Sequence, residues 1–149
     1  MKKTLFLLVG VALCFTACKK QSEKDEELIL EYISENNLDA LSTSEGLYYI
    51  INEEGTGDRP AVTDEVIADY EGYLLDGSVF DSSYERGQPS TFPLSGVILG
   101  WQIGIPFFKE GGSGKLIIPS ELGYGDRSPS SKIPKNSVLV FDIELIEVL

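Results

Sequence analysis

The run "SVLVFDIELIEVL" at residues 137–149 places the strongest constraint on the fold, because apolar and polar residues alternate along most of it. Side chains of a β-strand point to opposite faces in turn, so a period of two separates one face from the other. Leu139, Phe141, Ile143 and Leu145 fall on one predicted face, and Val140, Asp142 and Glu144 fall on the other. A strand with one core face and one mostly solvated face is typical of an antiparallel sheet.

Two earlier runs also have strand character. "LYYIINEEGTG" at residues 47–57 is rich in β-forming residues and ends in glycines. "EVIADYEGYLL" at residues 65–75 places Val66, Ala68 and Tyr70 on one face of a predicted strand. Asp76 and Gly77 follow it directly and fit the tight turn of a hairpin. These segments predict further antiparallel strands.

One segment between the strands predicts a buried helix. "VILGWQIGIPFF" at residues 97–108 is apolar all round, whereas a surface helix keeps a polar face. An antiparallel sheet wrapped on one such helix is a stable α+β arrangement. The chain has 149 residues and no internal repeat, which favours a single domain of this class.

Charge and missing residue types exclude several functions. The chain has 24 acidic and 12 basic side chains, so binding of nucleic acid is not expected. It contains no histidine, which removes the usual base for Ser82 or Ser83 and excludes a hydrolase triad. "EGGSGKL" departs from a phosphate-binding loop and is expected to be a turn into a strand. No metal-ligand spacing is present, and we expect neither metal nor cofactor.

The N-terminus resembles an export signal. Lys2 and Lys3 precede a short apolar run, and Thr16 and Ala17 come directly before Cys18. This pattern resembles a bacterial lipoprotein signal, in which residues 1–17 are removed and Cys18 carries the lipid. Simple cleavage and an uncleaved anchor remain alternatives. The favoured reading predicts an exported protein held in the bacterial envelope by its lipid, at the periplasmic face or the cell surface.

Residues 18–44 are predicted to be an acidic tether and a short helix. "KKQSEKDEE" suits a solvated spacer, with a surface-export signal as the alternative. Ser22 and Asp25 fit a capping box, and an apolar stripe follows at helical spacing. This stripe is expected to pack on the domain or on a second copy of the chain.

Four motifs resemble the FKBP-type peptidyl-prolyl cis-trans isomerases in order and spacing. They are "YEGYLLDGSVFDSS", "VILGW", "KLIIPSELGYG" and "IPKNSVLVFDIELIEV". The resemblance implies a domain over residues 45–149 with a half-open antiparallel barrel around one short helix. It also implies an apolar pocket between the sheet and the helix, in which Xaa-Pro bonds of polypeptide substrates are rotated without covalent or metal chemistry.

The resemblance also implies where the pocket residues lie. Its catalytic positions fall on Tyr70, Phe80, Asp81, Trp101, Tyr124 and Phe141, and its substrate-binding walls fall on Val97, Ile98 and Ile133. Asp81 would orient neighbouring groups, and the Ile98 backbone N–H would donate to a peptide carbonyl. The residues alone leave an alternative, since Tyr70, Trp101 and Phe141 could be ordinary core and Asp81 a turn cap. Tyr124 lies between two glycines in a predicted loop. A large aromatic side chain in a loop is seldom needed for packing, so this position favours a functional role.

Two other functions remain open beside the isomerase. A proline-binding chaperone could use the same pocket with little turnover, and a tethered adhesin has support only from the signal. Ser90, Pro129 and Lys132 depart from the pattern at the pocket rim, so macrolide binding stays open. The chain could be a monomer or a homodimer.

Overall fold

The structure is a computed structural model that describes residues 8–149, with side chains from residue 19 onward. The predicted basic start at Lys2 and Lys3 lies outside the described residues, and so does the side chain of Cys18. Within the described part, seven strands form one antiparallel sheet in the order β1-β2-β6-β7-β3-β4, and β5 also pairs with β3. The strands are β1 Leu41–Ser42, β2 Tyr48–Glu53, β3 Glu65–Leu74, β4 Val79–Ser82, β5 Ser90–Pro93, β6 Ser113–Ile118 and β7 Leu139–Val148.

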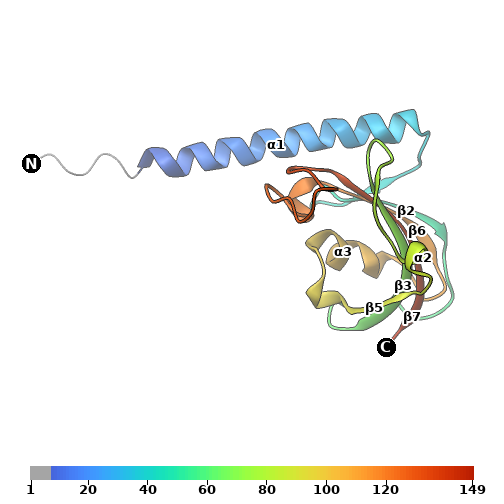
Figure 1. Ribbon diagram of the computed structural model, residues 1–149. Coiled ribbons are helices and arrows are strands. Elements are labelled where there is room, and N and C mark those ends of the chain that lie inside the picture. Colours follow the sequence, from blue (N-terminus) through green and yellow to red (C-terminus); the bar gives the residue numbers. More distant parts are fainter. Residues whose placement is uncertain (1–7) are drawn as a thin grey trace, which may run out of the picture.

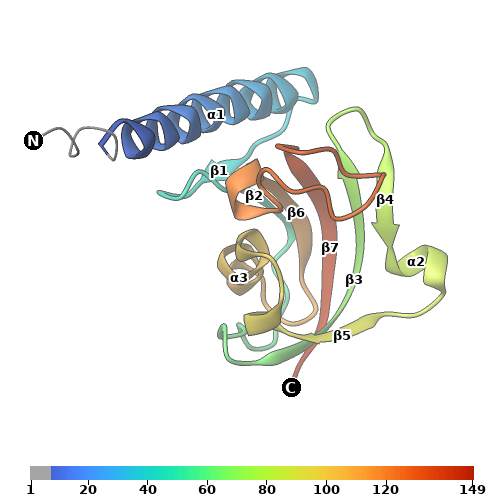
Figure 2. The ribbon, with the colours of Figure 1, turned by 60° about the vertical axis from the view of Figure 1, so that its left-hand side comes forward.

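The sheet curves around the helix α3 (Leu99–Gly104), which lies on its concave side (Figure 2). The predicted α+β class with a half-open sheet around one short helix is confirmed. The hairpin turn is also confirmed: Gly77 has a φ of 85°, and its N–H donates to the Leu74 carbonyl between β3 and β4. "EGGSGKL" is the predicted turn into β6.

Two glycines allow α3 to approach the sheet closely. A Cβ on Gly100 would lie 2.4 Å from Ile118 Cγ2, and one on Gly104 would lie 2.6 Å from Leu116 Cδ1. Any larger side chain at these positions would push the helix away from β6. The close contact buries Trp101 against the sheet, where it is 5% exposed. A 3-10 turn, η2 (Ile105–Phe107), continues directly from α3.

The helix α1 (Leu8–Glu35) lies across the opposite face of the sheet and extends away from it toward the N-terminus (Figure 1). The sequence predicted a tether over residues 19–27 and a helix start near Ser22. Both expectations are wrong in their local structure, because these residues are helical and Asp25 is buried rather than at a cap. Within residues 8–149, no helix combines the length and apolarity needed to cross a membrane.

The outer face of the sheet is therefore not mostly solvated as predicted. Val140 is fully buried beneath Ile29 of α1, in a second core separate from the one around α3. Its buried members are Ile29, Ile117, Val138 and Val140, with Tyr32, Ile33, Leu38, Tyr48, Tyr73 and Leu75 packed at its edges. The prediction that the apolar stripe of this helix packs on the domain is borne out.

The edge of β3 has two partners with a gap between them. β5 pairs with its first half at Glu65–Ala68, and β4 pairs with its second half at Glu71–Tyr73. The short helix α2 (Ser83–Arg86) fills the space between the two strands. The 3-10 turns η1 (Leu94–Gly96) and η3 (Ser120–Leu122) lie before α3 and after β6. These irregular segments surround the open end of the concave face.

Candidate functional site

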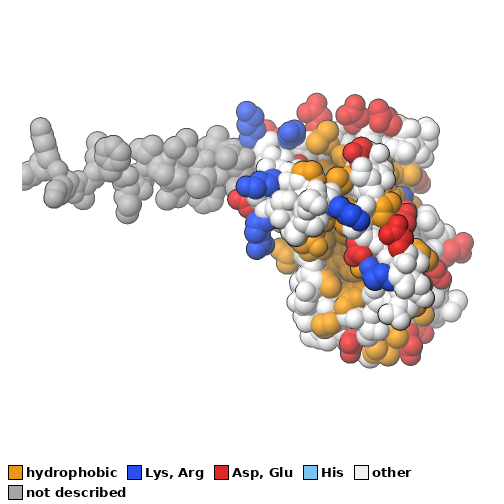
Figure 3. All heavy atoms as spheres, viewed as in Figure 1, with side chains coloured by type: hydrophobic (Ala, Val, Ile, Leu, Met, Phe, Trp, Pro, Cys, Tyr) orange, Lys and Arg blue, Asp and Glu red, His pale blue; other side chains and the backbone are white. Residues whose placement is uncertain are grey.

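A cavity of about 680 Å³ opens between the concave face of the sheet and the start of α3. All nine residues that the sequence singled out for binding or catalysis line it: Tyr70, Phe80, Asp81, Val97, Ile98, Trp101, Tyr124, Ile133 and Phe141. Figure 3 shows apolar side chains gathered in a hollow at the centre of one face, with charged groups around it. Residues distant in the sequence therefore meet in one site of mixed apolar floor and polar rim.

Trp101 forms the centre of the apolar floor. Its ring packs edge-on against Tyr70 at 4.9 Å and against Phe141 at 5.1 Å between ring centroids. Phe80 packs edge-on against Phe141 at 5.5 Å. Edge-to-face geometry is favoured between aromatic rings, so the rings hold one another in place. The sequence left open whether these residues form the pocket or the hydrophobic core. Trp101 and Phe141 do both, because they belong to the main core and also line the cavity.

A polar network holds the Tyr70 side of the cavity. The Tyr70 hydroxyl donates to Asp81 Oδ2 at 2.5 Å, and the Arg86 guanidinium pairs with the other Asp81 oxygen. Arg86 also donates to the Tyr70 hydroxyl at 3.0 Å and to Ser90 Oγ at 2.9 Å. Burial, together with the hydrogen bond to Asp81, raises the pKa of Tyr70 above its usual value. Both carboxylate oxygens of Asp81 are thus engaged, one by Tyr70 and the other by Arg86.

The Ser83 hydroxyl is engaged in hydrogen bonds with β3. It donates to Asp69 Oδ1 at 2.6 Å and accepts from the Tyr70 backbone N–H at 2.9 Å. It therefore provides an acceptor for a backbone N–H group of β3 that has no partner strand between β4 and β5. Ser82 caps α2 by accepting from the Glu85 N–H.

Three hydrogen-bond donors in the cavity wall lack a partner among the described residues. The Ile98 backbone N–H precedes α3 and has no acceptor, and the Tyr124 hydroxyl makes no hydrogen bond. The Trp101 indole N–H is buried and also without an acceptor. Buried donors normally have partners, so the Ile98 N–H and the Tyr124 hydroxyl are suited to a ligand's carbonyl groups. Burial, and then the charge of Asp81, raise the pKa of Tyr124, which keeps its hydroxyl protonated.

Sequence reasoning missed several residues of this site, including Arg86 of the polar network, Phe92 and Gly72. Phe92 of β5 lines the cavity with its ring centroid 5.1 Å from that of Trp101. It lies two residues after Ser90 on the same face of the strand, and this alternation was the available signal. Gly72 lies beneath the pocket wall, where a Cβ would come within 2.6 Å of Phe80 and 2.7 Å of Phe141. Gly72 lies inside the predicted strand at residues 65–75, and a glycine within a strand often marks a close approach of other atoms.

The three residues that depart from the family pattern do not all lie at the cavity. Ser90 and Pro129 line the cavity, whereas Lys132 does not, and it is exposed. The Arg86 guanidinium donates to Ser90 Oγ, so this position contributes a fixed polar group to the rim.

The sheet, the buried helix and the apolar cavity between them define a small α+β domain with an open ligand pocket. Residues 57–146 match the family model of the FKBP-type peptidyl-prolyl cis-trans isomerases. The chain belongs to this family, as its four sequence motifs led us to expect.

Known members of the family are similar over most of the chain. A protein of Neisseria meningitidis named as a probable FKBP-type peptidyl-prolyl cis-trans isomerase FkpA is 42% identical over 130 residues, covering 87% of this chain and 47% of the relative. FkpA of Escherichia coli is 49% identical over 107 residues, covering 72% of this chain and 39% of the relative. The crystal structure of Escherichia coli FkpA matches with a TM-score of 0.75 at 37% identity, over 98% of this chain and 74% of that one. The chain spans less than half the length of these curated relatives.

Proposed function

We propose that this protein catalyses the cis-trans isomerisation of Xaa-Pro bonds in polypeptide substrates. The observation that carries the proposal is the cavity itself, in which all nine expected residues meet around an aromatic floor. The names of the relatives support the same activity, as does membership of their family. No covalent intermediate, metal or cofactor is required by this chemistry.

The barrier to rotation comes from amide resonance and is about 18–20 kcal/mol. Twisting the bond reduces conjugation, so a site that holds the twisted amide more tightly than the planar one lowers the barrier. Trp101 would support the proline ring, while Phe80 and Phe141 exclude water from it. The Tyr124 hydroxyl and the Ile98 N–H, both open donors, would hold the carbonyls on either side of the rotating bond.

Asp81 would act through Tyr70 rather than as an acid or base. Its two oxygens are occupied by the Tyr70 hydroxyl and the Arg86 guanidinium, which leaves its position fixed. The network would keep the Tyr70 ring upright against Trp101 and so preserve the shape of the floor.

The direct test is turnover of a short Xaa-Pro peptide, measured beside suppression of aggregation of an unfolded protein. Catalysed isomerisation at substoichiometric protein would support the proposal. A protein that suppresses aggregation but does not accelerate isomerisation would instead be the proline-binding chaperone that the sequence left as an alternative.

The pH dependence of catalysis should be nearly flat. Because the mechanism transfers no proton and the chain has no histidine, kcat/KM should change little from about pH 6 to 8.5, where a titrating base would produce a limb. The raised pKa of Tyr70 and of Tyr124 keeps both hydroxyls protonated over this range. A steep limb near neutrality in a protein that remains folded would contradict catalysis by orientation and water exclusion alone.

We further propose that residues 1–17 are a signal peptide, residues 18–44 connect a lipid on Cys18 to the catalytic domain, and residues 45–149 form that domain. The basic start and the small residues before Cys18 support this division. The substrates would then be exported proteins of the bacterial envelope. The open pocket is also a candidate macrolide site, and the protein a candidate monomer or homodimer.

Replacement of the lipidated residue gives a specific test of the anchor. Cys18→Ser should abolish metabolic acyl labelling and release the protein from the membrane fraction. The matched control is Cys14→Ser, which removes the chain's other cysteine and should leave both properties unchanged. Equal labelling of Cys18→Ser and the parent protein would rule out a lipid at this position.

A further inference from the structure

One buried carboxylate connects α1 to the turn before Tyr124. Asp25 is 1% exposed, although the other acidic residues of the run 19–27 are exposed. Its Oδ2 accepts from the backbone N–H of Ser120 at 2.8 Å and from the Ser120 hydroxyl at 2.5 Å. Its Oδ1 accepts from Gln21 Nε2 at 2.7 Å. Burying a carboxylate is costly unless it is hydrogen-bonded, and these three bonds fix its position.

Ser120 in turn organises the backbone around Tyr124. Its carbonyl accepts from the backbone N–H of Gly123 at 3.0 Å and from that of Gly125 at 2.7 Å. These glycines flank Tyr124 on both sides, and Gly125 takes a left-handed φ of 59° that bends the chain there. A continuous path of hydrogen bonds therefore runs from Asp25 through Ser120 to both neighbours of Tyr124.

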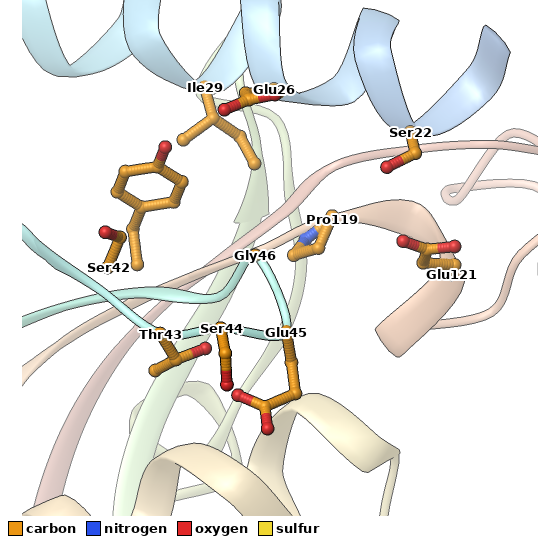
Figure 4. A pocket seen from close by; sticks show the side chains of 11 residues that line it. Ser22, Glu26, Ile29, Ser42, Thr43, Ser44, Glu45, Gly46, Pro119 and Glu121 are labelled. Carbon is orange, nitrogen blue, oxygen red and sulfur yellow. The ribbon is translucent and has the colours of Figure 1, made fainter. Parts of the chain in front are cut away.

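Close apolar packing does not fill the space beside this contact. Figure 4 looks into a cavity of about 350 Å³ between α1 and the segment that enters η3. Ser22 and Glu26 of α1 reach into it from one side, and Pro119 and Glu121 line the other. Because this cavity is largely polar and solvent-accessible, the position of η3 against α1 depends at this point on the bonds made by Asp25.

We propose that Asp25 is a positioning residue for the site: through Ser120 it holds the turn that places Tyr124 in the pocket wall. The inference rests on the proposed isomerase function for its effect on catalysis. Loss of the carboxylate leaves the Ser120 N–H and hydroxyl buried without an acceptor, and a shift of η3 that rehydrates them displaces Tyr124. The helix α1 thereby becomes part of the catalytic domain rather than only its connection to the N-terminus.

Amide hydrogen exchange tests the positioning directly in the full chain. Asp25→Ala should accelerate exchange at the Gly123 and Gly125 amides, because their acceptor, the Ser120 carbonyl, is no longer held. Glu26→Ala is the matched control, since it removes the same charge from a neighbouring exposed position and should leave both amides protected. Unchanged protection of both amides in Asp25→Ala would overturn the proposal. Should Asp25→Ala fail to fold, Asp25→Asn, which retains one acceptor oxygen, should show an intermediate increase.

Catalysis gives a second, separate measurement. Asp25→Ala should lower kcat/KM by about threefold to tenfold, comparable to the loss of one hydrogen bond. Once Tyr124 has been replaced by Phe, adding Asp25→Ala should cost less than about twofold, because both changes remove the same interaction. Equal losses in the two backgrounds would show that Asp25 acts elsewhere. If the parent protein has no turnover, the proposed function fails, while amide exchange still decides the role of Asp25.

Discussion

Phe80→Ala should lower kcat/KM for an Xaa-Pro peptide by about tenfold or more, which corresponds to about 1.4 kcal/mol or more of transition-state stabilisation. Phe80 packs edge-on against Phe141 and forms the cavity wall that the hairpin delivers. Removing its ring admits water to the place where the twisted amide would be held. The measurement is steady-state isomerisation at several peptide concentrations, so that kcat and KM are separated.

Tyr124→Phe is the comparison for this variant, because it removes one hydroxyl and leaves the ring. Its expected cost is about 0.5–1.5 kcal/mol, the net value of a hydrogen bond. Loss of a buried aromatic side chain can destabilise a protein by about 3–5 kcal/mol, so unfolding curves must show that both variants are folded at the assay temperature. If Phe80→Ala is folded and has the parent's kcat/KM, the Phe80 ring does not contribute to catalysis.

The concave half of the molecule could be predicted because its residues obey two strong rules. Alternation in β7 places Phe141 on the inner face, and the fully apolar segment around Trp101 must be buried. The four motifs then supplied the register that brings Phe80 and Tyr124 to the same cavity. Residue patterns alone could not have separated floor from core, because in this structure one set of rings serves both.

The outer half was less predictable for a physical reason. Val140 alternates with core residues, so the sequence pattern places it as a single apolar residue on the solvent-exposed face. Its neighbours in the sequence do not indicate that α1 covers it. Asp25 reads as one more charge in a solvated run, and only the fold brings Ser120 to it. Phe92 and Gly72 were missed because their roles depend on which ring or wall lies opposite, which is a tertiary property.

Removal of residues 1–42 should leave a protein that unfolds cooperatively but with a free energy of unfolding lower by about 3 kcal/mol or more. The core around α3 does not include α1, which is why the shortened chain should still fold. Ile29, however, is fully buried against Ile117 and Val140, and its loss exposes the outer face of the sheet. Denaturant unfolding of the full and shortened chains gives the difference directly.

Two single substitutions in the full chain test whether the lower free energy of unfolding comes from lost packing of α1 rather than from shortening the chain. Ile29→Ala in the full chain should cost about 2–5 kcal/mol, as expected for a buried aliphatic side chain. Leu30→Ala changes the next residue of the same helix, where the side chain is 48% exposed, and should cost less than about 1 kcal/mol. If Ile29→Ala and the shortened chain both retain the parent's unfolding midpoint, α1 does not stabilise the sheet. In that case its contact with Ser120 would have to hold the turn before Tyr124 without support from the packing around Ile29.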